Sequence, residues 1–190
     1  MTVATNKEGA IADYLIVAGM SRFTVRAFAG GLLSGMGHNP VVSISDFTGE
    51  AHWDPAEPQK ALLRIQIRAA LLAVQNDISD KDRREMERGM REDVLETDKY
   101  PEIVFESTSV SANANGRAEI DGNLTLHGVT RRERVPAQFA LTGDILRAFG
   151  DFTIRQTDYR LKLASVAGGA LKLKDELKFN FDIVARKRTE

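Results

Sequence analysis

The sequence predicts an all-β fold, an eight-stranded antiparallel up-and-down barrel with one helical excursion at about residues 79–95. Most of the chain alternates apolar and polar residues with the period of two that strands with one buried face show. Almost every join carries a hairpin signal, such as Asn113-Ala-Asn-Gly116 or Gly143-Asp144. Because successive hairpins place consecutive strands side by side, this pattern favours a barrel over a sandwich.

The first strand is expected to be bent or broken. Residues 14–17 and 22–28 are predicted to form its two pieces, and in the second piece Phe23 and Val25 alternate with polar neighbours. The segment 30–40 that follows is too rich in glycine for a stable helix, so we expect a loop there.

The second and third strands are predicted at 41–53 and from residue 63 onward. The apolar face of 41–53 changes side part-way, which predicts a bulge near Asp46 or Gly49. Residues 63–69 alternate cleanly, and the apolar stretch after them should continue the strand to Val74.

One segment, 79–95, is charged and helical in character. Ser79 is a plausible N-cap, and the apolar residues Met86, Met90 and Val94 form a narrow stripe along one side. Such a stripe suits a helix that lies across the end of a barrel. The remaining strands are predicted at 102–110, 117–127, 132–142, 144–155 and 172–186.

Composition narrows the classes of function. The 190 residues are expected to form a single domain over 1–190, with 1–12 disordered. The chain has 26 Lys plus Arg against 27 Asp plus Glu, so no net field favours nucleic acid as a partner. There is no cysteine, which excludes thiolate metal sites, and no apolar run is long enough for a transmembrane segment. The N-terminal residues lack the pattern of a secretory signal, so we expect a cytoplasmic protein.

Several short motifs, taken in order, resemble one family. They are Ser21-Arg-Phe-Thr-Val25, Phe47-Thr-Gly49, Tyr100-Pro-Glu-Ile-Val-Phe-Glu-Ser107, Gly122-Asn-Leu-Thr-Leu-His-Gly-Val-Thr130, Gly150-Asp-Phe-Thr-Ile154 and Leu173-Lys-Asp-Glu-Leu-Lys-Phe-Asn-Phe181. From about 21 to 186 the chain resembles the YceI-like family of polyisoprenoid-binding or lipid-binding proteins. The resemblance implies a lipocalin-like barrel with an elongated apolar cavity that holds a long isoprenoid chain. The chain departs from the expected pattern at Arg160, where the resemblance leads us to expect a glycine after the aromatic Tyr159.

Alternation places one set of apolar side chains inside the predicted barrel. The predicted ligand-binding residues are Phe23, Val25, Ile65, Ile67, Phe105, Leu124, Leu126, Phe139, Phe152, Phe179 and Phe181, and Ile120 shares their face. From the residues alone, this face could equally line a cavity or fill a core, since a small eight-stranded barrel can be filled by its own side chains. The resemblance favours the cavity.

Few polar residues have a claim to chemistry. His38, Met86 and Met90 are expected to border the cavity mouth, whereas His52 and His127 are expected at the surface or in turns, without a metal. Arg131, Arg132 and Arg134 could grip a ligand phosphate or simply protect a strand edge. No catalytic motif and no cofactor site is predicted.

The leading hypothesis is therefore non-catalytic binding or carrying of a long apolar molecule, most plausibly a polyisoprenoid lipid or an isoprenoid quinone. One alternative is a filled-core barrel that acts as a protein-interaction module. The other is an enzyme on an apolar substrate, which would use His38 or His52 with a carboxylate such as Asp54. A barrel edge or the mouth could support a homodimer.

Overall fold

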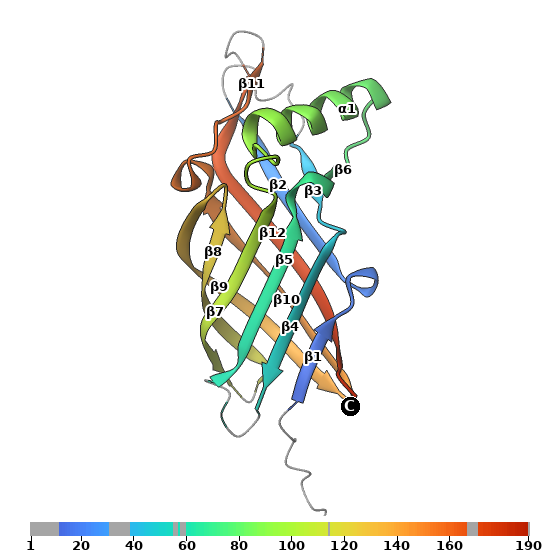
Figure 1. The fold of residues 1–190 in the computed structure, drawn as a ribbon, viewed down its shortest axis with the longest axis vertical. Coiled ribbons are helices and arrows are strands. Elements are labelled where there is room, and N and C mark those ends of the chain that lie inside the picture. Colours follow the sequence, from blue (N-terminus) through green and yellow to red (C-terminus); the bar gives the residue numbers. More distant parts are fainter. Residues whose placement is uncertain are drawn as a thin grey trace, which may run out of the picture.

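The computed structural model describes residues 12–30, 39–54, 57, 60–113, 115–166 and 171–189. Its strands form one antiparallel sheet that closes because β1 (Ala12–Ile16) pairs with the end of β12 (Leu171–Lys187). The result is an elongated barrel with eight wall positions, which confirms the predicted fold class (Figure 1). The helix α1 (Asp80–Gly89) crosses one end of the barrel, which we call the upper end.

Three of the wall positions are each made by two short strands instead of one long strand. The pairs are β1 with β2 (Arg22–Gly30), β3 (Val41–Ser43) with β4 (Phe47–Trp53), and β5 (Leu62–Arg68) with β6 (Ala73–Val74). The first break is the 3₁₀ turn η1 (Ala18–Met20) and the third is the 3₁₀ turn η4 (Ala69–Leu71). The second break falls at 44–46, where the strand is divided in place of the bulge predicted near Asp46 or Gly49.

The other wall strands are continuous and lie within a few residues of their predicted bounds. They are β7 (Glu102–Ala112), β8 (Arg117–Leu126), β9 (Val129–Thr142), β10 (Ile145–Arg155) and β12, with the short β11 (Ser165–Val166) beside the start of β12. Each pairs with the strand next to it in sequence from β7 to β10, as successive hairpins require.

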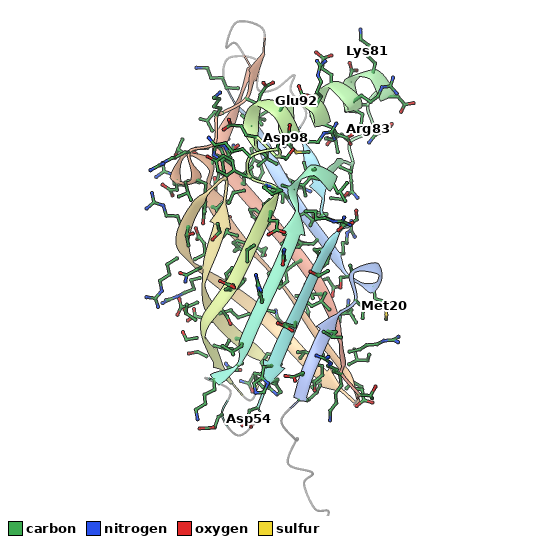
Figure 2. All side chains as sticks on the ribbon, in the orientation of Figure 1. Met20, Asp54, Lys81, Arg83, Glu92 and Asp98 are labelled. Carbon is green, nitrogen blue, oxygen red and sulfur yellow. The ribbon has the colours of Figure 1, made fainter. Side chains whose placement is uncertain are left out.

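The helical excursion begins where the sequence predicts. The Ser79 side chain accepts a hydrogen bond from the backbone N–H of Asp82 at 3.1 Å, and α1 continues into one π-helical turn, η5 (Met90–Val94). Arg83 donates to two backbone carbonyls near β6, on the barrel side of α1, whereas Lys81 points the other way (Figure 2). Met90 and Val94 lie against the core. The described helices include none that is long and apolar enough to cross a membrane.

Candidate functional site: the barrel interior and a gap in its wall

The inner face of the barrel carries the predicted apolar residues. All of the predicted ligand-binding side chains except Phe139 belong to one apolar cluster that runs along the barrel axis. Phe23 is central to it, because its ring contacts the rings of Phe47, Phe179 and Phe181. Phe139 shares the inner face of β9 but lies further down, where its ring is 5.4 Å from the Trp53 ring.

Several side chains of this cluster are only half-buried, although they point inward. They include Ile65, Phe105, Ile120, Phe152 and Leu177. Ile65 and Phe105 are directly paired across β5 and β7, at mid-height in the wall. The inner face therefore combines a well-packed aromatic cluster with a row of aliphatic and aromatic groups that keep accessible surface.

Two phenylalanine rings lie along the wall, over positions that lack a side chain. A Cβ atom at Gly122 would collide with the Phe105 ring, and one at Gly150 would meet the Phe181 ring at 3.0 Å. Glycine at these two positions lets the rings lie flat against the wall. This arrangement brings the rings toward the strands and away from the barrel axis.

The predicted mouth residues are placed unevenly. Met90 contacts the core, whereas Met86, one turn earlier in α1, is exposed. His38 lies outside the described residues.

His52 faces outward from β4 and its Nδ1 lies 2.7 Å from the Asp13 carboxylate. This pair borders an outer groove of about 720 Å³ that also exposes Leu62.

A gap in the wall separates the upper parts of β9 and β10. The two strands pair only from Ile145 opposite Thr142 to Phe149 opposite Gln138, although both continue well beyond this ladder. Pro136 stands next to the point of separation and cannot donate a ladder hydrogen bond. Gly150 still lies close to Pro136 and Ala137, so we call the unpaired stretch between residues 129–135 and 151–155 the wall gap.

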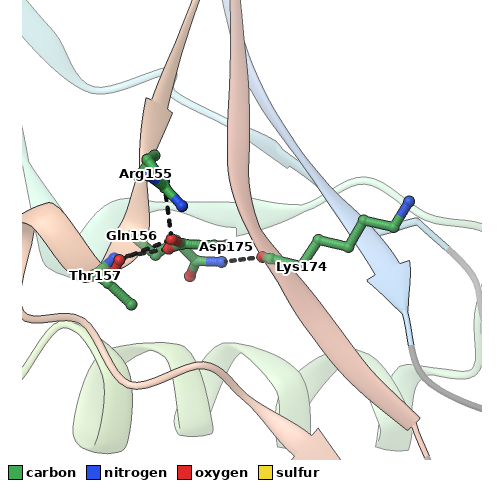
Figure 3. A network of polar contacts seen from close by, with 5 residues as sticks. All are labelled: Arg155, Gln156, Thr157, Lys174 and Asp175. Atoms are coloured by element: carbon green, nitrogen blue, oxygen red, sulfur yellow. Dashed lines mark hydrogen bonds and ion pairs between the residues drawn. The ribbon is translucent and has the colours of Figure 1, made fainter.

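The 3₁₀ turn η6 (Gln156–Tyr159) fills the wall gap, and Figure 3 shows how β12 holds it. The Asp175 carboxylate accepts hydrogen bonds from the backbone N–H and the hydroxyl of Thr157 at 2.8 and 2.7 Å, and Arg155 lies 3.2 Å away. These bonds hold the pKa of the Asp175 carboxyl below its ordinary value. Gln156, which is buried, donates to the Lys174 carbonyl at 2.8 Å.

On its other side η6 is held by a tyrosine and a glutamate. The Tyr159 side chain is fully buried, and its hydroxyl donates to Oε1 of Glu133 at 2.6 Å. Burial, followed by the nearby Glu133 carboxylate, raises the pKa of the Tyr159 phenol, so it stays protonated. Glu133 also borders a pocket of about 400 Å³ that opens on the outer side of the wall gap. Sequence reasoning missed this pair, because Glu133 stands within a run of arginines.

The histidine at the β8–β9 turn is also less peripheral than expected. His127 adopts a φ of +51°, and its side chain is only 11% exposed. Its Nε2 lies 2.7 Å from the Glu96 carboxylate, and the centroid of its ring lies 4.5 Å from the centroid of the Tyr100 ring. The hydrogen bond with His127 lowers the pKa of Glu96. His127 thus ties the segment after α1 to the barrel wall.

The three arginines do not form one cluster. Arg131 donates to the Asp158 carbonyl at 3.1 Å on the η6 side, whereas Arg134 pairs with Asp121 at 3.1 Å on the outer face. Arg132 also turns toward Asp121, at 4.0 Å. The structure therefore does not bring them together around one phosphate. Among the described residues there is also no group of three or more His, Asp or Glu that could hold a metal ion.

With this geometry in place, comparison with known proteins gives the family. The model of the YceI-like domain matches residues 18–185. The chain belongs to the YceI-like family. Its curated relatives include a UPF0312 protein of Pseudomonas putida, 32% identical over 97 residues that make up 51% of this chain and 47% of the relative. A UPF0312 protein of Shewanella sp. is 36% identical over 97 residues, 50% and 48% of the two chains. The chain thus spans about half the length of the curated relatives it matches.

Solved structures share the barrel at low sequence identity. Burkholderia cenocepacia BcnA superposes with a TM-score of 0.71 at 17% identity, over 89% of this chain and 98% of that protein. A polyisoprenoid-binding domain from Saccharophagus degradans superposes with a TM-score of 0.63 at 12% identity, over 94% and 100%. These similarities establish the fold of the YceI-like barrel.

Proposed function

We propose that this YceI-like barrel binds a long apolar molecule along its axis, a polyisoprenoid lipid or an isoprenoid quinone, and carries or sequesters it without chemical change. The observation that carries the proposal is the inner face, where Ile65, Phe105 and Phe152 point inward and yet keep accessible surface. A core filled by its own side chains would bury such groups completely. The polyisoprenoid-binding domain with the same fold supports the same class of ligand.

Burial of the chain alone can supply the affinity. Each buried CH₂ group contributes about 0.8 kcal/mol, so a five-carbon unit contributes up to roughly 4 kcal/mol before the entropy of binding is subtracted. A few such units are enough for tight binding. This binding needs no directional chemistry, which fits an inner face made of aliphatic and aromatic groups.

The proposed lack of catalysis rests on where the polar groups lie. His52 and Asp13 form their pair on the outer face, away from the apolar inner face. His127 uses its ring nitrogens on Glu96 and on the Tyr159 carbonyl, so its described contacts give it a structural role.

One substitution distinguishes an open interior from a filled core. Ile120 is half-buried on the inner face of β8, and Ile120→Trp should occupy the space that the ligand needs. We expect it to reduce the affinity for geranylgeraniol at least about tenfold while the free energy of unfolding changes by less than about 1 kcal/mol. In a filled core the same change would cost about 1–3 kcal/mol.

The matched control is Asn123→Trp, which adds the same ring on the exposed face of the same strand. It should leave the affinity for geranylgeraniol unchanged. Equal binding by wild type and Ile120→Trp, with a clear loss of stability in Ile120→Trp, would contradict the proposal.

A further inference from the structure

The wall gap brings a carboxylate to an otherwise apolar wall. Glu133 pairs directly with Gly122 across β8 and β9, and directly paired residues of antiparallel strands share a face. That face is the inner one, because the Phe105 ring lies over Gly122 on this side. Glu133 is half-buried and also borders the 400 Å³ pocket outside the gap, so its carboxylate stands where the interior meets the surface.

The described partners of Glu133 leave it with acceptor capacity. The Tyr159 hydroxyl donates to Oε1, and an ionised carboxylate has about four acceptor positions in total. The arginines beside it in sequence are engaged elsewhere, Arg131 with the Asp158 carbonyl and Arg134 with Asp121. Glu133 therefore has acceptor positions left toward the interior, with one described donor, the Tyr159 hydroxyl, on one of its oxygens.

We propose that Glu133, held in place by Tyr159, binds the polar end of the barrel's apolar ligand, and that this end is a hydrogen-bond donor such as the hydroxyl of a long prenyl alcohol. The inference rests on the proposed function, since it assigns the head group of the same ligand. The chain of that ligand runs along the inner face past Phe105, and its hydroxyl donates one hydrogen bond to an acceptor position of the Glu133 carboxylate.

The same geometry disfavours two other head groups. A phosphate or diphosphate would meet the Glu133 carboxylate. Of two arginines near it in sequence, Arg134 pairs with Asp121, and Arg131, on the same face as Glu133, already donates to the Asp158 carbonyl. An oxidised quinone offers only acceptors, and the Tyr159 hydroxyl already donates to Glu133. The site thus prefers an alcohol or a reduced quinol to an oxidised quinone or a prenyl diphosphate.

Equilibrium binding of three probes that share one apolar chain tests this preference in the wild-type protein. The probes are geranylgeraniol, its methyl ether, which cannot donate, and its diphosphate. We expect the alcohol to bind about tenfold more tightly than the ether, because hydrogen bonds to charged groups are the stronger ones. The diphosphate should bind more weakly than the ether.

Two variants test the residue. Glu133→Gln retains an acceptor for Tyr159 and removes the charge, so the alcohol should lose several-fold in affinity and the diphosphate should gain. Glu133→Leu combined with Tyr159→Phe removes both partners and should abolish the preference for the alcohol over the ether. Glu119→Gln is the control, because Glu119 is exposed on the outer face of β8. It should leave all three affinities unchanged.

The outcomes separate this inference from the function on which it rests. If the three probes bind equally, or the diphosphate binds best, and Glu133→Gln changes nothing, the head-group assignment is wrong while the apolar carrier stands. If no probe binds to wild type, the proposed function fails and the assignment fails with it.

Discussion

The lower and upper halves of the barrel are closed by different means. In the lower half every wall strand is bonded to both neighbours, and the ladder between β1 and β12 completes the ring. In the upper half two wall positions are interrupted, at 44–46 and at η4, β9 and β10 separate, and η6 occupies the wall gap. In the upper half, side-chain hydrogen bonds hold η6 in the wall, whereas in the lower half backbone ladders hold neighbouring strands together.

This difference has a consequence for stability and for access. A backbone ladder tolerates most substitutions, whereas a plug held by a few side chains depends on each of them. We therefore expect the upper half to open first and to be the route by which an apolar ligand enters.

The largest effect is expected at Tyr159, the fully buried residue of η6. Tyr159→Ala should lower the free energy of unfolding by about 3–5 kcal/mol, because it leaves a cavity in place of an aromatic ring. Tyr159→Phe should lower it by about 1.5–3 kcal/mol, because it removes only the hydrogen bond to the Glu133 carboxylate. Urea unfolding followed by circular dichroism measures both.

A tyrosine of the lower half gives the matched control. Tyr14 is also buried, but it pairs through the backbone with both β4 and β12. Tyr14→Phe should change the free energy of unfolding by less than about 0.5 kcal/mol. Equal losses for the two Tyr→Phe variants would contradict the contrast between the halves.

Acid should loosen the upper half more than the lower half. Asp175 and Glu96 both have pKa values lowered in the folded protein, by hydrogen bonds from Thr157 and His127 respectively. A lowered folded pKa means that the stabilisation is complete above the ordinary values of 3.8 and 4.5 and is lost as the pH falls through the folded ones. In the lower half the hydrogen bond from Arg147 also lowers the pKa of Asp182, but there the backbone bonds of the β10–β12 ladder hold the same strands and do not titrate.

Amide hydrogen exchange measures this loss residue by residue. Between pH 7 and about pH 3, protection of the Thr157 amide should fall more than that of Ala148 in the β10–β12 ladder, after correction for intrinsic rates. Asp175→Asn should bring the low protection of Thr157 to neutral pH. A uniform loss of protection across both halves would argue against the contrast.

The smallest effect is expected at Arg160, which ends η6 with a φ of +57°. Arg160→Gly should relieve the left-handed strain and raise the free energy of unfolding by up to about 1 kcal/mol. In the lower half, Gln138→Gly on the exposed face of β9 should instead cost about 0.5–1 kcal/mol, since extended backbone gains nothing from glycine. A loss of stability in Arg160→Gly would show that the side chain contributes more than the strain costs.

The sequence anticipates the lower half better than the upper half for a physical reason. Alternation along β7, β8, β10 and β12 reports which face is buried, and backbone pairing then follows from the hairpins. Two of the three breaks in the first strands were also visible, at 18–20 and, from the change of apolar face, near Asp46. The break at η4 was not, and the predicted continuous strand to Val74 is wrong, because the apolar stretch after residue 69 has no sign of a turn. Even the expected glycine after Tyr159 marks a real feature, since Arg160 adopts the left-handed conformation there.

The wall gap was harder to foresee because its contacts are long-range and polar. Asp175 and Thr157 are 18 residues apart, and Tyr159 and Glu133 are 26 apart. One signal was present, since continuing the alternation of Val135 and Ala137 up β9 places Glu133 on the inner face. Pro136 marked the end of the ladder in the same stretch.

Native mass spectrometry of the protein as purified, followed by solvent extraction, tests the central claim most directly. We predict that the wild-type protein has a mass above that of the bare chain, and that extraction removes the added mass and yields a long-chain isoprenoid. Ile120→Trp should lack the added mass, whereas Asn123→Trp should retain it. A homogeneous bare mass in wild type, unchanged after incubation with geranylgeraniol, would contradict it.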